Sequence, residues 1–162
     1  MNVLLVLIEE EEVHKIGTMA RKIWNEYYPK IIGQKQVDYM LSRFYNDLSL
    51  TNQMREGQNF YLIMDGSEAL GYISVSIDPL GNGFIHKFYI DSHRRKKGIG
   101  SAAFEQLQHQ FPQLINLKLQ VNRQNIIAIN FYFKMGFTIQ EAADFDIGNG
   151  YFMNDFVMVR TF

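Results

Sequence analysis

Residues 94–101 form the stretch whose residue types and spacing most directly suggest chemistry. They read Arg-Arg-Lys-Lys-Gly-Ile-Gly-Ser, between an apolar run with strand character, Phe84 to Ile90, and a helical pattern over 101–111. Such a turn leaves backbone N–H groups unpaired at a helix N-terminus, where the helix dipole favours negative charge. The two glycines allow close approach to the backbone, and the four cations attract a polyanion. The stretch predicts a cradle for a pyrophosphate.

Two other phosphate-binding loops fit this segment less well. A P-loop needs two glycines five positions apart, followed by Lys and Ser or Thr, and the chain has no such spacing. A dinucleotide-binding fingerprint accepts the alanine at 103, but it also needs an acidic residue about twenty positions further on. The residues at 120–123 are Gln, Val, Asn and Arg, so this fingerprint is incomplete.

A different pattern matches at two separate places. Arg95, Gly98 and Gly100 fit the pattern Arg/Gln-x-x-Gly-x-Gly/Ala. A second block follows at the expected distance, and it consists of Val121, Asn125, Ala128, Phe131-Tyr132, Lys134 and Gly136-Phe137. With both blocks in order, the chain resembles the Gcn5-related N-acetyltransferase (GNAT) family. The resemblance covers about residues 59–162 well, whereas 1–58 fit only by general pattern.

The resemblance implies acetyl-coenzyme A as the cofactor. It assigns cofactor contacts to Phe88, Tyr89, Ile90, Arg95, Lys96, Lys97, Gly98, Ile99, Gly100, Ser101, Asn125, Tyr132 and Lys134. In the family, the strand that ends at Ile90 splays from the next one, so that its backbone can bind the pantetheine arm and the acetyl carbonyl. Asn125 is also a good N-cap for its helix, and Lys134 is as readily interpreted as a surface lysine.

Acetyl transfer to an amine sets two proton-transfer tasks. An alkylammonium with a pKa near 10.4 is only about 0.1% neutral at pH 7, so a proton must be removed before attack. The departing thiolate benefits from a proton donor, and the family pattern assigns this role to Tyr132. The alternative for Tyr132 is a core aromatic between Phe131 and Phe133.

The general base is not identified by the sequence. His86, on the strand before Phe88, has a suitable intrinsic pKa, and Glu26 and Asp38 lie on the N-terminal helices. The histidines show no metal-site spacing, so no metal is predicted. The acceptor is expected between the first two helices and the C-terminal hairpin. Its candidate residues are the aromatics Trp24, Tyr27, Tyr28, Tyr39 and Tyr45 and the acids Asp144, Asp146 and Asp155.

Composition limits the class of protein. With 162 residues and 47% hydrophobic content, the chain is expected to form a single globular acetyltransferase-like domain over 1–162. A net charge of −1 argues against a nucleic-acid partner. The chain has no cysteine, which excludes disulfides and a thiolate nucleophile. No apolar run is long enough to span a membrane. We expect a cytoplasmic protein with a small-molecule amine substrate, and a homodimer is left open.

Hydrophobic periodicity predicts the order β-α-α-β-β-β-α-β-α-β-β. Strands are expected at 3–8, 59–64, 70–77, 84–90, 115–121, 137–143 and 151–161, and helices at 9–28, 34–47, 101–111 and 125–135. Residues 49–57 fit either a short helix or a loop. The fold class is therefore α+β, with a mixed central β-sheet flanked by helices.

These observations favour an N-acetyltransferase that moves the acetyl group of acetyl-CoA directly to a primary amine. A small polyamine is the leading acceptor, because acids with aromatics suit a cation. The alternatives are a peptide or protein N-terminal acetyltransferase, and a non-catalytic acyl-CoA-binding regulatory module. Asn125 and Tyr132 together favour an enzyme, since binding alone needs no acid.

Overall fold

A computed structural model describes residues 2–95 and 98–162. In this part of the chain, seven strands form one mixed sheet in the order β1-β2-β3-β4-β5-β7-β6, which confirms the predicted fold class. The strands are β1 (Val3–Leu7), β2 (Asn59–Asp65), β3 (Glu68–Ile77), β4 (Asn82–Ile90), β5 (Asn116–Asn122), β6 (Thr138–Gly148) and β7 (Tyr151–Thr161). The α-helices are α1 (Val13–Tyr27), α2 (Pro29–Ile32), α3 (Gln34–Phe44), α4 (Asp47–Arg55), α5 (Ile99–Gln110) and α6 (Ile126–Lys134).

The chain forms two compact units, each built from two separate segments. Unit 1 comprises Met1–Ser76 and Lys87–Pro112, and unit 2 comprises Ile77–His86 and Gln113–Phe162. Strand β4 therefore contributes its first half to unit 2 and its second half to unit 1. None of the helices in the described ranges is both long and apolar enough to span a membrane.

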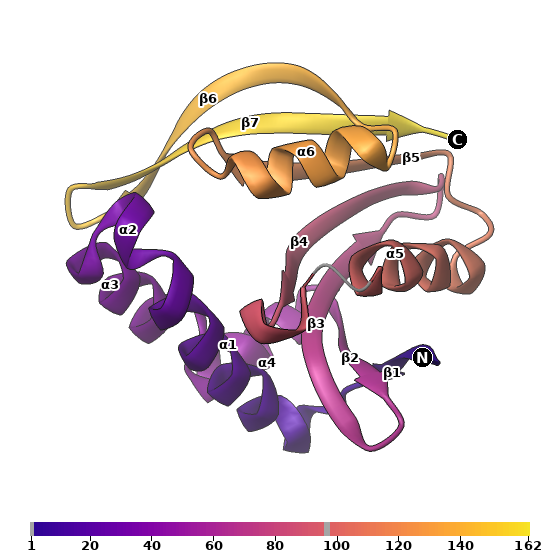
Figure 1. Cartoon of the computed structure of the whole chain (residues 1–162), viewed down its shortest axis with the longest axis horizontal. Helices are drawn as coiled ribbons and strands as arrows, with labels where there is room; N and C mark the ends of the chain where they lie inside the picture. Colours follow the sequence, from indigo (N-terminus) through magenta and orange to yellow (C-terminus); the bar gives the residue numbers. More distant parts are fainter. Residues whose placement is uncertain (1, 96–97) are drawn as a thin grey trace. The chain divides into compact units, whose positions relative to one another are not determined.

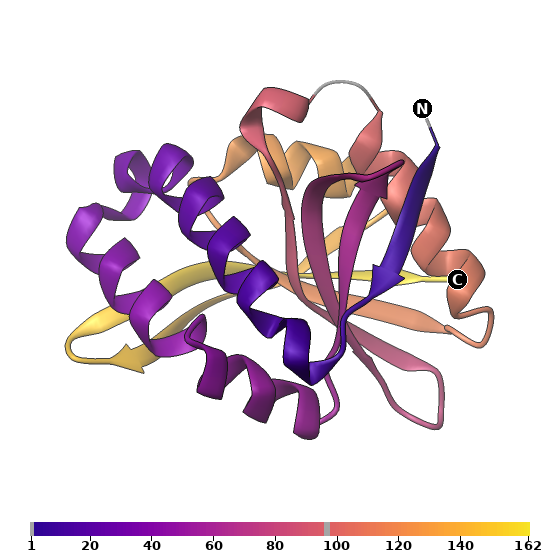
Figure 2. The ribbon, with the colours of Figure 1, turned by 90° about the horizontal axis from the view of Figure 1, so that it is seen from below.

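Unit 1 combines an antiparallel group of strands with helices on either side. β2 pairs with β1 and with β3, in registers that include Leu5↔Ile63 and Tyr61↔Ile73. Figure 2 shows α1 to α4 gathered on one side of these strands and α5 on the other. The apolar positions of α1 recur at helical spacing, so Ile16, Ala20 and Ile23 lie buried on one face.

The N-terminal helical region is divided more finely than the sequence predicted. Four helices replace the two expected, and the ambiguous segment 49–57 lies largely in α4. Pro29 does not simply end a helix: it is the first residue of α2, where its missing N–H is not needed. Asn46 divides the second predicted helix, because its side chain accepts a hydrogen bond of 2.8 Å from the Ser49 N–H and caps α4.

Unit 2 is built around β5. This strand pairs in parallel with β4, from Asn82↔Asn116 to Ile85↔Leu119, and antiparallel with β7. Figure 1 shows β6 and β7 as a long curved hairpin with α6 beside it. The hairpin extends five residues beyond the predicted end of its first strand. Asn149 and Gly150 both adopt positive φ, 55° and 79°, as a two-residue hairpin turn requires.

Candidate acetyl-transfer site

The glycine segment begins a helix in unit 1, as predicted. Gly98 adopts φ +76°, in the left-handed region, and no side chain caps α5, which starts at Ile99. The Ala102 N–H is the donor that reaches back to the Gly98 carbonyl at 3.0 Å. The N–H groups of the preceding first-turn residues have no helical partner. Chain neighbours aside, a Cβ added at Gly98 would meet no atom of the described residues within 4 Å. The start of α5 is thus an open, uncapped set of donors that fits a phosphate group, whereas Lys96 and Lys97 lie outside the described residues.

The chain just before this loop is tied to α1. The Asp91 carboxylate accepts a hydrogen bond of 2.6 Å from the Lys22 ammonium and one of 3.0 Å from the His93 N–H. Burial alone would raise the pKa of the Asp91 carboxyl, but these bonds outweigh it and hold the pKa below its ordinary value. Asp91 also caps the short 3-10 turn η2 (Ser92–Arg94). The approach to α5 is therefore fixed by charge and hydrogen bonds.

Arg95 is held inside unit 1 by its side chain. Its guanidinium lies 4.6 Å from the centroid of the Tyr27 ring, and its Nε donates to the Ile90 carbonyl at 3.2 Å. Arg94 forms an ion pair with Glu68. Both side chains therefore have protein partners. What Arg95 offers to the predicted cradle in this arrangement is its backbone.

A cluster that the sequence analysis did not predict lies beside η2. Glu26 accepts a hydrogen bond of 2.8 Å from the Ser92 hydroxyl and lies 3.7 Å from the His93 imidazole. With Asp91, these residues present ligand-type atoms within 4.8 Å of one another. No spacing in the sequence signals the cluster, because Glu26 is far from the others along the chain. Lys22 already supplies a cation to Asp91, so the cluster is accounted for as an internal ion-pair network.

Three of the aromatics predicted for the acceptor site are core residues of unit 1. Trp24, Tyr28 and Tyr45 are each at most 9% exposed. The Trp24 indole N–H donates to the Tyr72 hydroxyl at 3.2 Å, and that hydroxyl donates to Tyr45 at 3.0 Å. Burial, together with the neighbouring tyrosines, raises the pKa of both hydroxyls well above the ordinary value. These rings belong to the core of unit 1, and any role at the acceptor stays a prediction.

Lys87 marks the start of the part of β4 that belongs to unit 1. Its ammonium donates to the Gln53 Oε1 at 2.5 Å and to the Gln58 Oε1 at 3.4 Å. It also lies over two rings, 5.5 Å from the centroid of Tyr45 and 5.2 Å from that of Phe60. Burial lowers the pKa of Lys87 to about 7. No local pattern around Lys87 predicts this lowered pKa, because the surrounding groups come from α4, β2 and the residues that lead into them.

Strand β4 is also closely packed along the edge that faces β3. A Cβ at Gly71 would lie 2.2 Å from the Tyr89 carbonyl oxygen. The Asp91 N–H donates to the Leu70 carbonyl at 2.9 Å. Within unit 1, this edge of the predicted cofactor strand is therefore occupied by β3. Phe88, Tyr89 and Ile90 stay predicted cofactor contacts.

In unit 2, α6 begins as the sequence predicted. The Asn125 side chain accepts a hydrogen bond of 3.2 Å from the Ala128 N–H, and this confirms its capping role. Tyr132 is 7% exposed, and its ring packs 5.4 Å from Phe131 and 5.6 Å from Phe137, measured between centroids. Lys134 is exposed. The ring of Tyr132 is thus part of the core, while the role of its hydroxyl stays a prediction.

The predicted base candidates lie in different surroundings. His86 is exposed, and its ring lies 4.8 Å from that of Phe84. Asp38 is exposed and accepts a hydrogen bond of 2.8 Å from Gln34. Glu26 is engaged with Ser92, as described above. All three residues are exposed, so none of them is a buried carboxylate or imidazole of the kind expected for a general base.

Asp155, by contrast, is a buried acid in the C-terminal hairpin. It is 5% exposed. Burial raises its pKa to about 6, with Arg123 lowering it and Asp144 raising it. Arg123 itself donates to the Asp144 Oδ1 at 2.7 Å. In the sequence, Asp155 is only one of several acids predicted near the acceptor, and nothing in the pattern of the strand separates it from Asp144 or Asp146.

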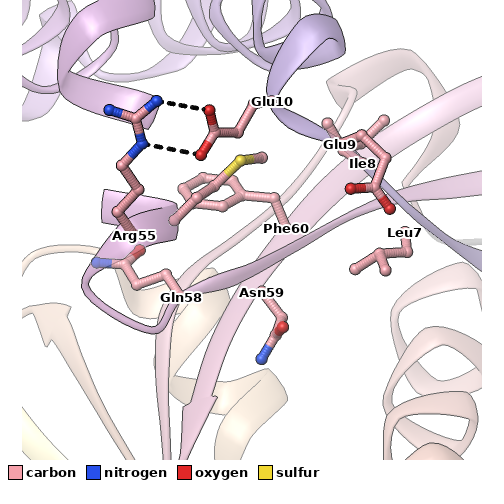
Figure 3. Close-up of a pocket in the computed structure, with 9 residues that line it drawn as sticks. Leu7, Ile8, Glu9, Glu10, Arg55, Gln58, Asn59 and Phe60 are labelled. Atoms are coloured by element: carbon pink, nitrogen blue, oxygen red, sulfur yellow. Dashed lines mark hydrogen bonds and ion pairs between the residues drawn. The ribbon is translucent and has the colours of Figure 1, made fainter. Parts of the chain in front are cut away.

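A shallow pocket of about 220 Å³ lies elsewhere in unit 1. Figure 3 shows the Arg55 guanidinium and the Glu10 carboxylate joined by two hydrogen bonds at its rim, of 2.9 and 2.8 Å. The lining consists of Leu7, Ile8, Glu9, Glu10, Met54, Arg55, Gln58, Asn59 and Phe60. None of the residues predicted for the acetyl-transfer site lines it.

Comparison with known proteins places these features in a family. Residues 18–137 match the model of the "Acetyltransferase (GNAT) family". The chain is 21% identical to spermidine N(1)-acetyltransferase of Thermoplasma acidophilum, across 87% of this chain and 91% of that protein. It is 32% identical over 81 residues to an uncharacterized N-acetyltransferase of Methanocaldococcus jannaschii, a match that spans 48% of this chain and 51% of the relative.

Among solved structures, PaiA N-acetyltransferase from Thermoplasma acidophilum in complex with coenzyme A has a similar fold. The TM-score is 0.81 at 20% identity, with all of both chains covered. A GCN5-related N-acetyltransferase from Rhodopseudomonas palustris gives 0.81 at 12% identity, covering 100% of this chain and 97% of the other. The family match extends over most of the sequence and includes both motif blocks. The chain therefore belongs to the acetyltransferase (GNAT) family, the family of acetyl-CoA-dependent N-acetyltransferases that its motifs predicted.

Proposed function

We propose that this N-acetyltransferase acetylates a primary amine of a small polycation, of which spermidine is the representative. The observation that carries the proposal is the match to a spermidine N(1)-acetyltransferase along nearly the full length of both chains. The acids of the C-terminal hairpin support it, because Asp144, Asp146 and Asp155 lie within a dozen residues. Carboxylates of this kind attract an ammonium and disfavour a neutral acceptor.

The cofactor contacts are proposed residue by residue. The open start of α5, at Gly98 to Ser101, receives the pyrophosphate on its backbone N–H groups. The backbone of Phe88 to Ile90 aligns the pantetheine arm, and Asn125 and Lys134 contribute from α6. Acetyl-CoA brings an activated thioester, so this chain needs only to hold it, to accept protons from the amine and to supply one to the sulfur.

Tyr132 is proposed as the donor to the departing sulfur. A tyrosine hydroxyl with an ordinary pKa near 10 is protonated at neutral pH and can transfer its proton to a thiolate. Its ring is locked between Phe131 and Phe137, and this packing limits where the hydroxyl can lie. Locked rotamers of this kind favour a precisely oriented donor.

An amine panel tests the acceptor. Spermidine, spermine, putrescine, n-butylamine and a peptide with a free N-terminus are supplied with acetyl-CoA, and release of free thiol is followed. We expect the polyamines to react fastest and their advantage over n-butylamine to shrink with added salt. A peptide that outcompetes every polyamine would replace the acceptor with a protein N-terminus. Binding of coenzyme A without turnover of any amine would indicate the binding module instead.

Gly98→Val tests the cradle. The new side chain projects into the open space beside the α5 N-terminus, so calorimetric affinity for coenzyme A should fall at least about tenfold. Gly66→Val is the matched control, because Gly66 also has positive φ, +59°, and open space around it, but lies in the β2–β3 turn. Both variants should lose similar stability, and only Gly98→Val should lose affinity. Equal affinities in the two folded variants would remove the cradle assignment.

Tyr132→Phe tests the acid. The variant keeps the ring and removes the hydroxyl, so coenzyme A affinity and thermal stability should change little. If the hydroxyl protonates the thiolate, kcat and kcat/KM should fall together, by roughly 10- to 1,000-fold. Full activity with an unchanged pH profile would show that Tyr132 serves packing alone.

A further inference from the structure

Asp155, on β7, lies beside the C-terminal end of β5, which is the end that leads into α6. Its register partner on β5 is Asn122, the last residue of that strand, and its partner on β6 is Ala143. The cap of α6, Asn125, follows Asn122 by three residues. Ligands of open α/β sheets bind near the carboxyl ends of parallel strands, and β5 is the strand that pairs in parallel with β4. Asp155 is therefore placed at the end of the sheet where this fold can hold a substrate.

The Asp155 carboxylate has no protein partner among residues 2–95 and 98–162. Arg123, whose charge lowers the pKa of Asp155, donates instead to the Asp144 carboxylate at 2.7 Å and to the backbone carbonyls of Ala143 and Asp155 at 3.3 and 3.4 Å. No ion pair in the described chain includes the Asp155 side chain. Every fully shielded side-chain polar atom there does have a partner. The carboxylate oxygens must therefore reach solvent from an otherwise buried residue.

Strand alternation shows which way this side chain points. The Arg160 guanidinium donates to the Met135 carbonyl at the end of α6, at 2.7 Å. Side chains alternate along a strand, and the pairing of β7 with β5 is regular from Asn122↔Asp155 to Asn116↔Thr161. Asp155 therefore points to the face of the sheet opposite α6, together with Val157. It lies on the opposite face of unit 2 from the core that holds Tyr132.

The charges around Asp155 leave it sensitive to a bound cation. Burial disfavours its ionised form, Arg123 from the turn after β5 favours it, and Asp144 on β6 opposes it, so that the pKa lies at about 6. On β7 itself, Arg160 is directed to α6. A buried carboxylate without a partner destabilises a folded protein. Such a group is a candidate for function when a ligand can supply the missing partner.

We propose that the Asp155 carboxylate binds the ammonium group of the acceptor amine and accepts its first proton. The proposal rests on the proposed acetyl transfer to an alkylamine and identifies the base that the sequence could not. Its support is the combination of burial, lack of a partner, contact with solvent and position at the end of β5. His86, Glu26 and Asp38 lack this combination.

The proton balance is simple. An alkylammonium loses two protons when it becomes an amide. The first passes to an Asp155 carboxylate oxygen and then to solvent, which leaves a neutral amine. The nitrogen lone pair forms the N–C bond while the C–S bond of the thioester breaks. The second proton leaves the nitrogen for solvent, and the sulfur takes one from Tyr132, which solvent restores. One proton is released overall.

Asp155→Asn, compared with Asp144→Asn, tests the assignment with spermidine as the probe amine. In wild type, kcat/KM should rise through an apparent pKa near 6. Asp155→Asn should lose roughly 100- to 10,000-fold in kcat/KM and lose this limb of the profile. Asp144→Asn should keep this limb of the profile but shift it to lower pH, because it removes a like charge near Asp155.

A carboxyl ¹³C titration provides a readout without turnover. In the protein bound to coenzyme A, the Asp155 carboxyl should titrate near 6, and saturating spermidine should lower its pKa, because an ammonium favours the ionised form. An unmoved titration, or an Asp155→Asn variant with coenzyme A affinity and wild-type activity, overturns the assignment while acetyl transfer stands. If wild type acetylates no amine on the panel, the proposed function itself fails, and the role of Asp155 fails with it.

Discussion

Lys87 in unit 1 and Asp155 in unit 2 are both buried ionisable groups, but their surroundings differ. The Lys87 ammonium has two amide oxygens and two aromatic rings around it. Asp155 has no hydrogen bond to its carboxylate in the described chain, and the Arg123 guanidinium, whose charge lowers its pKa, is bonded to Asp144. Burial favours the neutral form of each group, so it lowers the pKa of Lys87 to about 7 and raises the pKa of Asp155 to about 6.

The difference separates a structural group from a candidate functional one. Lys87 joins β4 to α4 and to the start of β2 through bonds that fold together with the chain. Its donors find acceptors in the protein, so it needs no ligand. Burial of the Asp155 carboxylate carries the same kind of cost, and the described chain offsets it only by the charge of Arg123, without a hydrogen bond to the carboxylate. A shifted pKa alone therefore does not indicate a functional site. A shifted pKa in a group that lacks a hydrogen-bond partner in the protein does indicate one.

The largest expected effect is the pH dependence of stability in Lys87→Met. The folded pKa of Lys87, about 7, lies below its unfolded value near 10.5. Between these values only the unfolded chain binds the proton, so wild type gains stability as pH rises from about 7 to about 10. The methionine variant lacks this gain. The difference between the two free energies of unfolding should change by roughly 2–5 kcal/mol in favour of wild type over this window.

Urea unfolding at several pH values measures this difference. Lys35→Met, at an exposed position on α3, is the control and should differ from wild type by an amount independent of pH. A difference in free energy of unfolding that does not change with pH for Lys87→Met would mean that the amide oxygens and rings keep the ammonium charged. The comparison of Lys87 with Asp155 would then fail.

Asp155→Asn should stabilise the protein at neutral pH. The folded pKa, about 6, lies above the ordinary value of 3.8. Below about pH 4 the carboxyl is protonated in both states and the substitution has no titration effect. Wild-type stability is lost as pH rises from about 4 to about 6, so at pH 7 the variant should be more stable by about 1–3 kcal/mol.

Thermal and urea unfolding of the two proteins across this range give the measurement, and Asp38→Asn on α3 provides the exposed control. A gain in stability combined with a loss of activity is the pattern expected for a functional residue that the fold tolerates at a cost. Destabilisation by Asp155→Asn at pH 7 would instead identify the carboxylate as a structural partner.

The smallest effect is expected within the satisfied region of unit 1. Tyr72→Phe removes the oxygen that accepts from Trp24 and donates to Tyr45. A buried indole N–H is left without its acceptor, so stability should fall by about 1–2 kcal/mol. In Tyr61→Phe the ring is also buried, at 7% exposed, but its hydroxyl makes no hydrogen bond in the described chain, so the change should be close to zero. Equal chemical-denaturation midpoints for the two variants would contradict this account of the network.

Sequence reasoning predicted the features that depend on neighbouring residues. The two glycines predicted the start of α5, and Asn125 predicted the N-cap of α6. Each of these features depends only on nearby residues, either through a positive φ angle or through one backbone N–H that a cap must satisfy. The predicted helix start at Gln34 was right, whereas the short helix α2 and the cap at Asn46 were not predicted.

The sequence could not distinguish the buried ionisable groups. Lys87 looks like any polar residue on a strand, and its surroundings depend on α4, more than thirty residues earlier. Asp155 differs from Asp144 only through the pairing of β7 with β5 and the direction of Arg123. Trp24, Tyr28 and Tyr45 are buried in the core of unit 1, and the sequence could not separate core packing from a role at the acceptor for these aromatics.

The alternation of chain segments between the two units has a consequence for assembly. Because residues 77–86 belong to unit 2 and the following residues, to Pro112, return to unit 1, no single cut in the chain yields both units intact. A ribosome that has released residues 1–112 has made all of unit 1 but only ten residues of unit 2. The parallel partner of β4 has not yet been synthesised. Because β4 must wait for β5, the sheet is completed late in folding. The β6–β7 hairpin, which carries Asp155, can therefore join the sheet only after the glycine loop has been made.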